Sequence, residues 1–404
     1  MTENPSPPLD LFDPQYRIDP APLFHRMRAE CPVLPMPMLG GFVLTRYHDI
    51  AGVLKDPRIG SANLTMLLDM LPPEAQQQVR PLRNSITRWM GHTQLEDHLR
   101  FQKLLKRYFT PQNVELMRPQ IQQACDRLLD QTAGQARIEV MEELAYPLSA
   151  TVMANLLGVP LEEWRTLKRW SNDLNVIFQT FDLDQLLQSQ KSALEMEEYM
   201  RPIVAERRRN RQNDLVSVFV NAQEEGSIHS EEEILSNCVL LLFAGHDTTA
   251  SLIGHGMRML LMHPTELAKL RAHPELMPSA IEEMLRFDGP AQLSVRIPQE
   301  DVVVGGQLIP AKQRIFLALH AANRDPAVFP DPDRFDIERK DNRHLGFGFG
   351  LFYCLGASLA RLQASVCFSA LLRRLPNMRL SDIEPSWNFQ PPILRLLSKY
   401  YIEC

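Results

Sequence analysis

The chain has 404 residues, of which 45% are hydrophobic and 23% are charged, so it is long enough to bury a large core and ordinary for a globular protein. Its net charge of −6 argues against nucleic acid as the main partner. The six cysteines lack the spacing of a disulfide framework or a zinc site, which suits a reducing compartment, and we expect a cytoplasmic protein.

Neither a membrane segment nor a domain boundary is evident in the sequence. The first residues lack an apolar stretch of signal-peptide length, and the longest apolar run, residues 238–244, is too short to cross a bilayer. No Gly/Ser-rich linker, block of charge or internal repeat divides the chain. We therefore expect one domain over residues 1–404, with a flexible proline-rich tail at residues 1–15, no membrane anchor and a monomeric state.

The first hundred residues predict short helices and a small sheet. Residues 16–30 and 49–54 have helical patterns, and residues 41–47 alternate in the manner of a strand. The stretch 64–71 is apolar and rich in methionine, which adapts its shape to neighbours. It either packs as ordinary core or forms a lid over a substrate, and the sequence favours packing.

Residues 98–108 predict a helix with two distinct faces. One face carries His98 and Gln102, followed by apolar residues at steps of three and four. The other face is basic, and it is either solvated surface or a docking site for an acidic protein. Its cations are Arg100, Lys103, Lys106 and Arg107.

Residues 120–209 are strongly helical, with breaks expected near Pro147, residues 158–160 and Asp182. Within this segment, Ile177 and Phe178 lie in a short apolar stretch. They are either core residues or part of a pocket roof; a core role is the more common one for such a stretch, and nothing else in the sequence separates the two interpretations.

The longest predicted helix runs for about 50 Å over residues 230–263, from a capping box to a proline. Its middle, residues 244–249, reads Ala-Gly-His-Asp-Thr-Thr, a set of residues that weakens a helix. The Thr248 hydroxyl can bond to the Ala244 carbonyl and loosen the helix beside Gly245. Such a local conflict in a central helix indicates a functional site.

Glu283 and Arg286 stand three residues apart on one face of the next predicted helix. Other Glu–Arg pairs with this spacing occur in the chain, and most such pairs are exposed and contribute little. The spacing is therefore weak evidence for a buried network. Further on, residues 302–309 predict a hairpin whose turn contains two adjacent glycines.

Residues 344–361, HLGFGFGLFYCLGASLAR, lead into a predicted helix that continues without Gly or Pro to residue 374. Cys354 is therefore expected at a helix N-terminus, where free N–H groups and the helix dipole favour a thiolate. The surrounding glycines let a bulky group approach the backbone. Such a cysteine is a nucleophile, one ligand of a metal cluster, the axial ligand of a haem, or a small buried hydrophobe.

Two of these interpretations find no support in the sequence. Cys367, the nearest other cysteine, lies about 20 Å along the same predicted helix and cannot share a metal with Cys354. Only His344 is near enough in sequence to act as a base, and no carboxylate to orient it is evident. A dinucleotide motif also fails, since its third glycine would fall on Leu351 or Tyr353.

The wider context favours the haem ligand, because the loop closely resembles the haem-binding loop of the cytochrome P450 family. Residues 244–249 are similar to the family's oxygen-activation motif, and Glu283 with Arg286 resembles the family's Glu-x-x-Arg pair. These two motifs and the Cys354 loop stand in the family's order, and the resemblance covers nearly the whole chain. The resemblance implies a mainly α fold with small β-sheets, of the soluble bacterial type, with haem between the long central helix and the helix after Cys354. The loop residues that carry it are Phe347-Gly-x-Gly350, Cys354-x-Gly356 and Leu359-Ala-Arg361.

The resemblance also implies roles for single residues. Cys354 would ligate the iron of haem b, and Asp247 and Thr248 would be the acid and the alcohol that guide protons during oxygen activation. Glu283, Arg286 and Arg334 would form a buried triad behind the haem. The remaining expected haem contacts are Ala244, Phe347, Gly348, Gly350 and Gly356.

Two positions depart from the family pattern for binding haem propionates. Gln102 and Phe352 stand where the family usually has basic residues. His98 and Arg296 match the family at two other propionate positions. We therefore expect His98 and Arg296 to anchor the haem, with Gln102 donating a hydrogen bond but no charge.

The resemblance implies a hydrophobic substrate, because apolar residues occupy the positions that border the family's pocket. Electrons are expected from NAD(P)H through a ferredoxin or flavodoxin-type partner, which docks near Arg100, Lys103, Lys106 and Arg107. The expected pocket residues are Met90, Ile177, Phe178, Leu240, Phe243, Ala291, Leu293, Val295, Ile393 and Leu394.

The function implied is a haem-thiolate monooxygenase that inserts one oxygen atom from O2 into a hydrophobic small molecule. The substrate would be a secondary metabolite, a terpenoid, a steroid or a fatty-acid-like compound. Two alternatives are a peroxide-driven peroxygenase, which does not need Asp247 and Thr248, and a haem-binding carrier or sensor without turnover.

Overall fold

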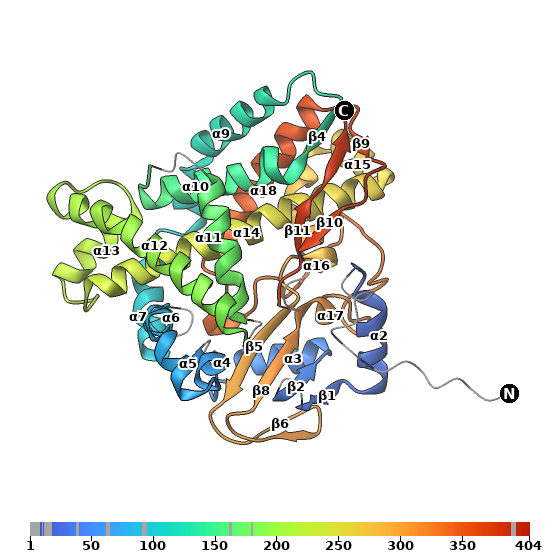
Figure 1. The fold of residues 1–404 in the computed structure, drawn as a ribbon. Helices are drawn as coiled ribbons and strands as arrows, with labels where there is room; N and C mark the ends of the chain where they lie inside the picture. The colour runs from blue at the N-terminus through green and yellow to red at the C-terminus, as the bar shows by residue number, and fades with distance from the viewer. Residues whose placement is uncertain are drawn as a thin grey trace.

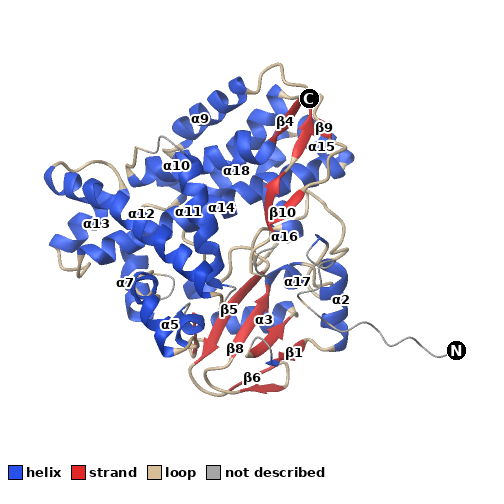
Figure 2. Cartoon of the chain, viewed as in Figure 1, coloured by secondary structure: helices blue, strands red, loops and turns tan. Residues whose placement is uncertain are grey.

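Helices make up most of the molecule, and the strands gather along its lower and right-hand sides (Figure 2). The computed structural model describes residues 9, 11, 18–37, 40–61, 65–90, 95–160, 164–178, 181–388 and 393–404. The expected tail at residues 1–15 lies almost wholly outside these ranges. The prediction of a mainly α fold with small β-sheets is confirmed. The helices are α2 (Ala21–Glu30), α3 (Tyr47–Lys55), α4 (Thr65–Asp69), α5 (Pro73–Gln78), α6 (Arg80–Ile86), α7 (Leu95–Lys106), α8 (Pro111–Glu115), α9 (Arg118–Gln131), α10 (Tyr146–Leu157), α11 (Trp164–Asn175), α12 (Leu183–Arg209), α13 (Leu215–Glu224), α14 (Glu231–Met262), α15 (Pro264–Ala272), α16 (Met277–Asp288), α17 (Leu319–Asn323) and α18 (Ala357–Arg374).

The helix ends follow caps and prolines that are visible in the sequence. Asp182 caps the 27-residue α12 with its side chain, and Gly158 ends α10 in the left-handed conformation, with φ of 69°. Pro147 lies in the first turn of α10 and does not break a helix, because the first turn has no use for the missing N–H. The predicted breaks at residues 158–160 and Asp182 are therefore helix boundaries, whereas near Pro147 a π-helical turn at Met141–Ala145 leads directly into α10.

α14 runs through the middle of the helical part of the molecule (Figure 1), and the helix predicted over residues 230–263 is confirmed. The Ser230 hydroxyl accepts from the Glu233 N–H at 3.1 Å, and the Glu233 carboxylate accepts from the His229 N–H at 2.6 Å. This reciprocal pair satisfies N–H groups at the start of the helix. α14 contacts α10, α11, α16 and α18, so its central residues meet groups from many parts of the chain.

The largest sheet has the strand order β1-β2-β8-β5-β3, in which only β2 and β8 are parallel. The strand predicted at residues 41–47 is β2. The hairpin predicted at residues 302–309 is β6 and β7, and its turn holds Gly305 and Gly306 at φ of 56° and 81°, which other residues rarely adopt. The strands are β1 (Val33–Met36), β2 (Gly41–Leu44), β3 (Ile59–Ser61), β4 (Arg137–Glu139), β5 (Leu293–Pro298), β6 (Val302–Val304), β7 (Gln307–Ile309), β8 (Arg314–Ala318), β9 (Arg379–Leu380), β10 (Ser386–Asn388), β11 (Leu396–Lys399) and β12 (Tyr401–Glu403).

Apolar side chains form one large core among the helices and two smaller cores around the five-stranded sheet. The apolar stretch at residues 64–71 contributes Leu68 and Leu71 to the large core, which favours packing over a lid. Among the helices that the structure describes, none is both long enough and apolar enough to cross a membrane.

Candidate active site

A short stretch of α14 is open while its neighbours are buried. Ala244 is exposed and Thr248 is half-buried, whereas Phe243 is buried. The Thr248 hydroxyl donates to the Ala244 carbonyl at 2.9 Å, so the hydrogen bond predicted from the sequence is confirmed. Glycine is needed at position 245 for helix packing, because a Cβ there would collide with the sulfur of Met153 on α10. Ala244 and Thr248, four residues apart, therefore share one open face of the helix.

Asp247 is buried and turns its carboxylate toward α11. Its Oδ2 accepts from Nδ2 of Asn175 at 3.0 Å, and its Oδ1 lies 3.0 Å from Nδ1 of the buried His246. Oδ1 accepts no hydrogen bond from the described part of the chain. Asn175 could not be predicted as a partner of Asp247, since nothing in α11 relates it to a residue 72 positions away. The acid thus stands next to Thr248 in the sequence but is held by another helix.

Cys354 lies in a turn just before α18, which begins at Ala357. Its N–H donates to the Phe347 carbonyl at 3.0 Å. Although the residue is exposed, burial of the sulfur by the surrounding protein raises the pKa of the thiol, and the Gly356 N–H and Arg361 lower it only in part. In the chain by itself, burial therefore opposes the thiolate that the helix N-terminus is expected to favour.

The glycines before Cys354 are required by the backbone of the loop. Gly348 and Gly350 have φ of 70° and 73°, in the left-handed region that favours glycine. A Cβ on Gly350 would also lie 2.6 Å from the Leu54 carbonyl oxygen. These glycines shape the loop that presents Cys354.

A buried cation without a counter-charge lies beside this loop. Arg296 on β5 donates to the Ser294 hydroxyl at 2.8 Å and to the Val295 carbonyl at 2.9 Å, and no carboxylate of the described residues pairs with it. Burial lowers the pKa of Arg296 to about 10. The guanidinium stands 5.1 Å from the centre of the Phe352 ring. A buried guanidinium in this state fits an anionic group such as a haem propionate.

His98 and Gln102 approach the same loop from α7. Nε2 of His98 lies 3.1 Å from the Leu351 carbonyl oxygen, and Nε2 of Gln102 donates to that oxygen at 2.8 Å. The His98 ring packs against the Phe352 ring at 4.5 Å between centroids. Phe352 therefore lies between His98 and Arg296, so the two residues expected to bind the propionates flank an aromatic ring.

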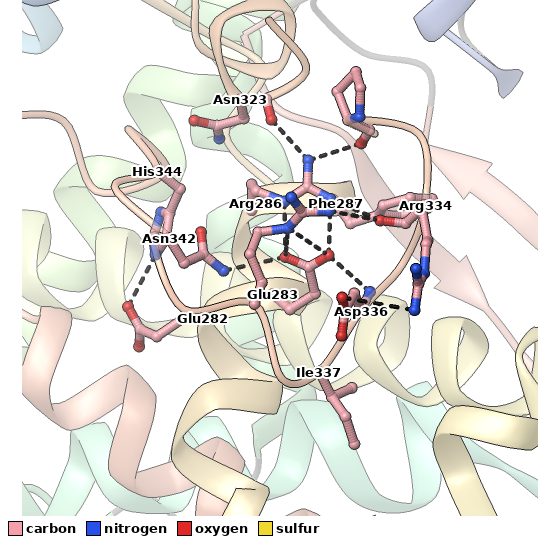
Figure 3. Close-up of polar contacts among 12 residues, drawn as sticks. Glu282, Glu283, Arg286, Phe287, Asn323, Arg334, Asp336, Ile337, Asn342 and His344 are labelled. Atoms are coloured by element: carbon pink, nitrogen blue, oxygen red, sulfur yellow. Dashed lines mark hydrogen bonds and ion pairs between the residues drawn. The ribbon is translucent and has the colours of Figure 1, made fainter. Parts of the chain in front are cut away.

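Glu283 and Arg286 form a fully buried ion pair at the centre of Figure 3, as the resemblance implies. The Glu283 carboxylate accepts from Nε and Nη2 of Arg286 at 2.7 and 2.8 Å. Arg286 also donates to the carbonyls of Asn323 at 2.9 Å, Pro332 at 2.8 Å and Arg334 at 3.1 Å, which uses all of its N–H groups. The pair ties α16 to the loop at residues 323–342.

The prediction that the Arg334 side chain completes this triad is wrong. Arg334 contributes only its carbonyl, while its side chain is 64% exposed and points toward Asp336 in Figure 3. The third arginine is Arg339, whose Nε lies 3.2 Å from Glu283 Oε2. Asp331, with a positive φ of 45°, turns the loop before Arg334, and this turn sends the Arg334 side chain outward.

A second carboxylate on α16 holds both ends of the Cys354 loop. Glu282 accepts from Arg361 Nε at 2.6 Å, and its Oε2 lies 2.9 Å from Nε2 of His344. Burial would raise the pKa of Glu282, but the hydrogen bonds from Arg361 and His344 outweigh it and lower the pKa to about 2. The expectation that His344 has no carboxylate partner is therefore wrong, and Glu282 holds the loop in place through His344 and Arg361.

The residues predicted to line a substrate pocket fall into two groups. One packs into the large core, and the other lies in β5 and the segment before it, near the C-terminal turn. At that meeting point Ala291 and Leu394 form an isolated antiparallel bridge. The side chain of Phe178 lies outside the described part of the chain. The first group is Met90, Ile177, Leu240 and Phe243, and the second is Ala291, Leu293, Val295, Ile393 and Leu394.

Most of the basic face predicted for α7 and the turn after it is exposed, with one correction. Arg100 turns inward, donates to Asp97 at 3.0 Å, and pairs with Glu233 and the Ser227 carbonyl at the start of α14. Its charge is therefore neutralised within the chain. The exposed cations are Lys103, Lys106 and Arg107.

Comparison with known proteins identifies the family. The cytochrome P450 family model matches residues 92–402. A biotin biosynthesis cytochrome P450 from Bacillus subtilis (strain 168) is 36% identical over 379 residues, covering 92% of this chain and 93% of that protein. The cytochrome P450 monooxygenase PikC from Streptomyces venezuelae is 37% identical over 394 residues, covering 94% and 90%.

Solved structures agree with this assignment. P450BioI, in a complex with acyl carrier protein carrying hexadec-9Z-enoic acid, superposes with a TM-score of 0.89 at 34% identity, over 96% of this chain and 99% of that one. The myxobacterial CYP267B1 in complex with myristic acid gives 0.87 at 38% identity, over 97% and 98%. The chain therefore belongs to the cytochrome P450 family, and it is a monooxygenase that binds haem b.

Proposed function

We propose that this monooxygenase hydroxylates or epoxidises a hydrophobic small molecule with one oxygen atom from O2. The supporting observation is the open face of α14, where the Thr248 hydroxyl bonds to the Ala244 carbonyl next to the buried carboxylate of Asp247. An alcohol and an acid placed together in an otherwise apolar helix can hold and pass a proton. This pair distinguishes the proposal from a peroxide-driven reaction, which needs no such proton delivery.

The residues around Cys354 fit haem b. Cys354 is the proposed iron ligand, and coordination to a metal cation deprotonates a thiol, which overcomes its raised pKa. Arg296 and His98 are the proposed partners of the propionates, since Arg296 is a buried cation without a carboxylate among the described residues. When bound, the haem supplies the O2 and C–H chemistry, and a thiolate ligand favours O–O cleavage. Further proposed contacts are Gln102, Ala244, Phe347, Gly348, Gly350 and Gly356.

Asp247 and Thr248 divide the proton handling in this proposal. Thr248 presents a hydroxyl at the open face, and Asp247 is the acid that supplies the proton. Because Asn175 holds the Asp247 carboxylate toward α11, the carboxylate must leave Asn175 before it can serve Thr248. Asn175 is therefore a positioning residue for the acid.

The substrate is proposed to be fatty-acid-like. The proposed pocket residues are apolar, so they favour an aliphatic ligand over a polar one. Two of the solved relatives hold myristic acid or a hexadecenoic acid attached to a carrier protein. A long aliphatic chain is therefore the first substrate class to test.

Electrons are proposed to come from NAD(P)H through a ferredoxin or flavodoxin-type protein in the cytoplasm. Its docking surface combines the exposed cations of α7 with Leu351 and Tyr353, which are 41% and 43% exposed. The two parts adjoin, because Gln102 of α7 bonds to the Leu351 carbonyl. Lys103→Glu should slow reduction by an acidic ferredoxin and weaken its salt dependence, whereas Lys191→Glu on α12 should not.

The test of the reaction uses the haem-loaded protein with myristic acid, NADPH and a surrogate ferredoxin with its reductase. We expect product heavier by one oxygen atom, and peroxide alone should give far less. Thr248→Ala should release more of the electrons as hydrogen peroxide, while Thr248→Ser should remain coupled to product. Equal turnover with peroxide, or coupling that does not change in Thr248→Ala, would contradict the proposed roles.

A further inference from the structure

A buried ion pair lies directly behind the second group of pocket residues. Asp288, the last residue of α16, is 5% exposed, and Arg395, which follows the C-terminal turn, is 8% exposed. Nη1 of Arg395 donates to the Asp288 carboxylate, and Nη2 donates to the Ile18 carbonyl at 2.6 Å. Burial would raise the pKa of Asp288, but the charge of Arg395 outweighs it and lowers the pKa. Both groups are therefore charged at neutral pH.

The ion pair continues a backbone pairing between the same two segments, which are 107 residues apart in the sequence. The Arg395 N–H donates to the Pro290 carbonyl at 2.8 Å. Next along, Ala291 and Leu394 form their antiparallel bridge, and the Gln292 N–H donates to the Ile393 carbonyl at 2.9 Å. The side chains of Asp288 and Arg395 thus close one end of the short ladder that holds Ala291 and Leu394.

The residues around the pair are closely packed and reach α14. A Cβ on Gly289 would lie 2.5 Å from the Leu285 carbonyl oxygen, so glycine is needed where the chain leaves α16. Burial lowers the pKa of His255 on α14 to about 4, so its imidazole is neutral at neutral pH and Nδ1 can donate to the Asp288 carbonyl at 2.8 Å. The Arg395 guanidinium stands 3.7 Å from the centre of a Trp387 ring. The pair is therefore fixed against the helix that carries Thr248.

We propose that the Asp288–Arg395 ion pair positions the Ala291 and Leu394 wall of the substrate pocket and thereby sets which ligands the pocket accepts. This inference rests on the proposed pocket role of Ala291 and Leu394. Neither Asp288 nor Arg395 touches the ligand, so both are positioning residues that act through the ladder.

A role in geometry explains the pair better than a role in stability. A buried ion pair adds little net stability, because the loss of hydration offsets the attraction between its charges. Its directional hydrogen bonds nevertheless allow only one arrangement of the two segments. Replacing both partners by neutral residues strands no charge, so the double variant should fold while the wall loses its constraint.

The test uses the haem-loaded full chain and two ligands that bind haem iron and differ in size. Imidazole contacts mainly the iron, whereas 4-phenylimidazole extends a ring toward the pocket wall. The dissociation constants of both are measured by spectral titration for the wild type, Asp288→Asn, Arg395→Met and the double variant. The control is Arg137→Met, which breaks the exposed Arg137–Glu403 pair between β4 and β12, 2.7 Å long with the arginine 41% exposed.

We expect the double variant to bind imidazole within about twofold of the wild type and 4-phenylimidazole about tenfold more weakly, because the wall is no longer preorganised. The control should leave both constants unchanged. An unchanged ratio of the two constants in the double variant would overturn the proposal. Failure of the double variant to fold would also overturn it, since the pair would then serve folding. If the wild type gives no azole spectrum, the proposed haem site fails instead, so the two failures are distinct.

Discussion

Replacing Arg339 by methionine tests which arginine completes the network around Glu283. The Arg339 side chain is 9% exposed, and its Nε lies 3.2 Å from Glu283 Oε2. The Arg334 side chain is 64% exposed and comes no closer than 3.8 Å to Asp336. Methionine keeps much of the apolar stem and removes the charge. We therefore expect Arg339→Met to lower the free energy of unfolding and Arg334→Met to leave it nearly unchanged.

The size of each effect follows from what remains around Glu283. In Arg339→Met the Glu283 carboxylate keeps both hydrogen bonds from Arg286 but loses its contact with Arg339. The carbonyls of Pro330, Asp331 and Arg334 each lose a donor as well, so we expect a loss of about 2–3 kcal/mol. Arg334→Met alters an exposed side chain and should stay within about 0.5 kcal/mol of the wild type. Glu283→Gln leaves the fully buried Arg286 without its counter-charge and should cost about 3–5 kcal/mol.

Urea unfolding of the haem-loaded proteins measures this order. Haem absorbance and tryptophan fluorescence should report the same midpoints, and the slopes should match among the variants so that midpoint shifts reflect stability. A loss in Arg334→Met as large as that in Arg339→Met would refute the arrangement of the network. So would an Arg339→Met variant as stable as the wild type.

Three further outcomes are expected. Cys354→Ser should abolish the reduced carbon-monoxide band of thiolate-ligated haem, and a band that persists would show that another residue binds the iron. Because the folded-state pKa of Glu282 is about 2 and its usual value is 4.5, its contacts stabilise the fold above pH 4.5, and this stabilisation is lost as the pH falls toward 2. The difference in unfolding free energy between the wild type and Glu282→Gln should therefore shrink by about 3 kcal/mol as the pH falls from 4.5 to 2. A difference that stays constant over this range would contradict the assignment. Asn175→Ala removes the amide that holds Asp247 and should raise the amount of peroxide released per electron consumed. If the peroxide yield does not change, Asn175 has a structural role only.

Features that depend on neighbouring residues could be predicted from the sequence. The bounds of α14 and α18 follow from local periodicity, caps and the absence of breakers, and the Thr248 hydrogen bond spans one helical turn. The Glu283–Arg286 pair also lies within one turn, so its spacing was visible. The haem-binding loop could be predicted from the family motif, because its glycines, its cysteine and the helix after it are adjacent in the sequence.

Contacts between distant segments could not be predicted in the same way. The side chain that completes the Glu283 network depends on the path of a loop, and a positive φ at Asp331 turns Arg334 outward while Arg339 comes in. The anionic state of Cys354 was expected from its place before a helix, but the burial of its sulfur raises its pKa.

The sequence by itself determined the helices, the hairpin, the cysteine loop and the order of the motifs, since each is encoded within a few turns of chain. Only the tertiary structure decided that Asn175 holds Asp247, that Glu282 holds the cysteine loop, and that Arg395 meets Asp288. The physical reason is that the partner of a buried charge is chosen by the packing of whole helices, which brings together residues that no local pattern relates.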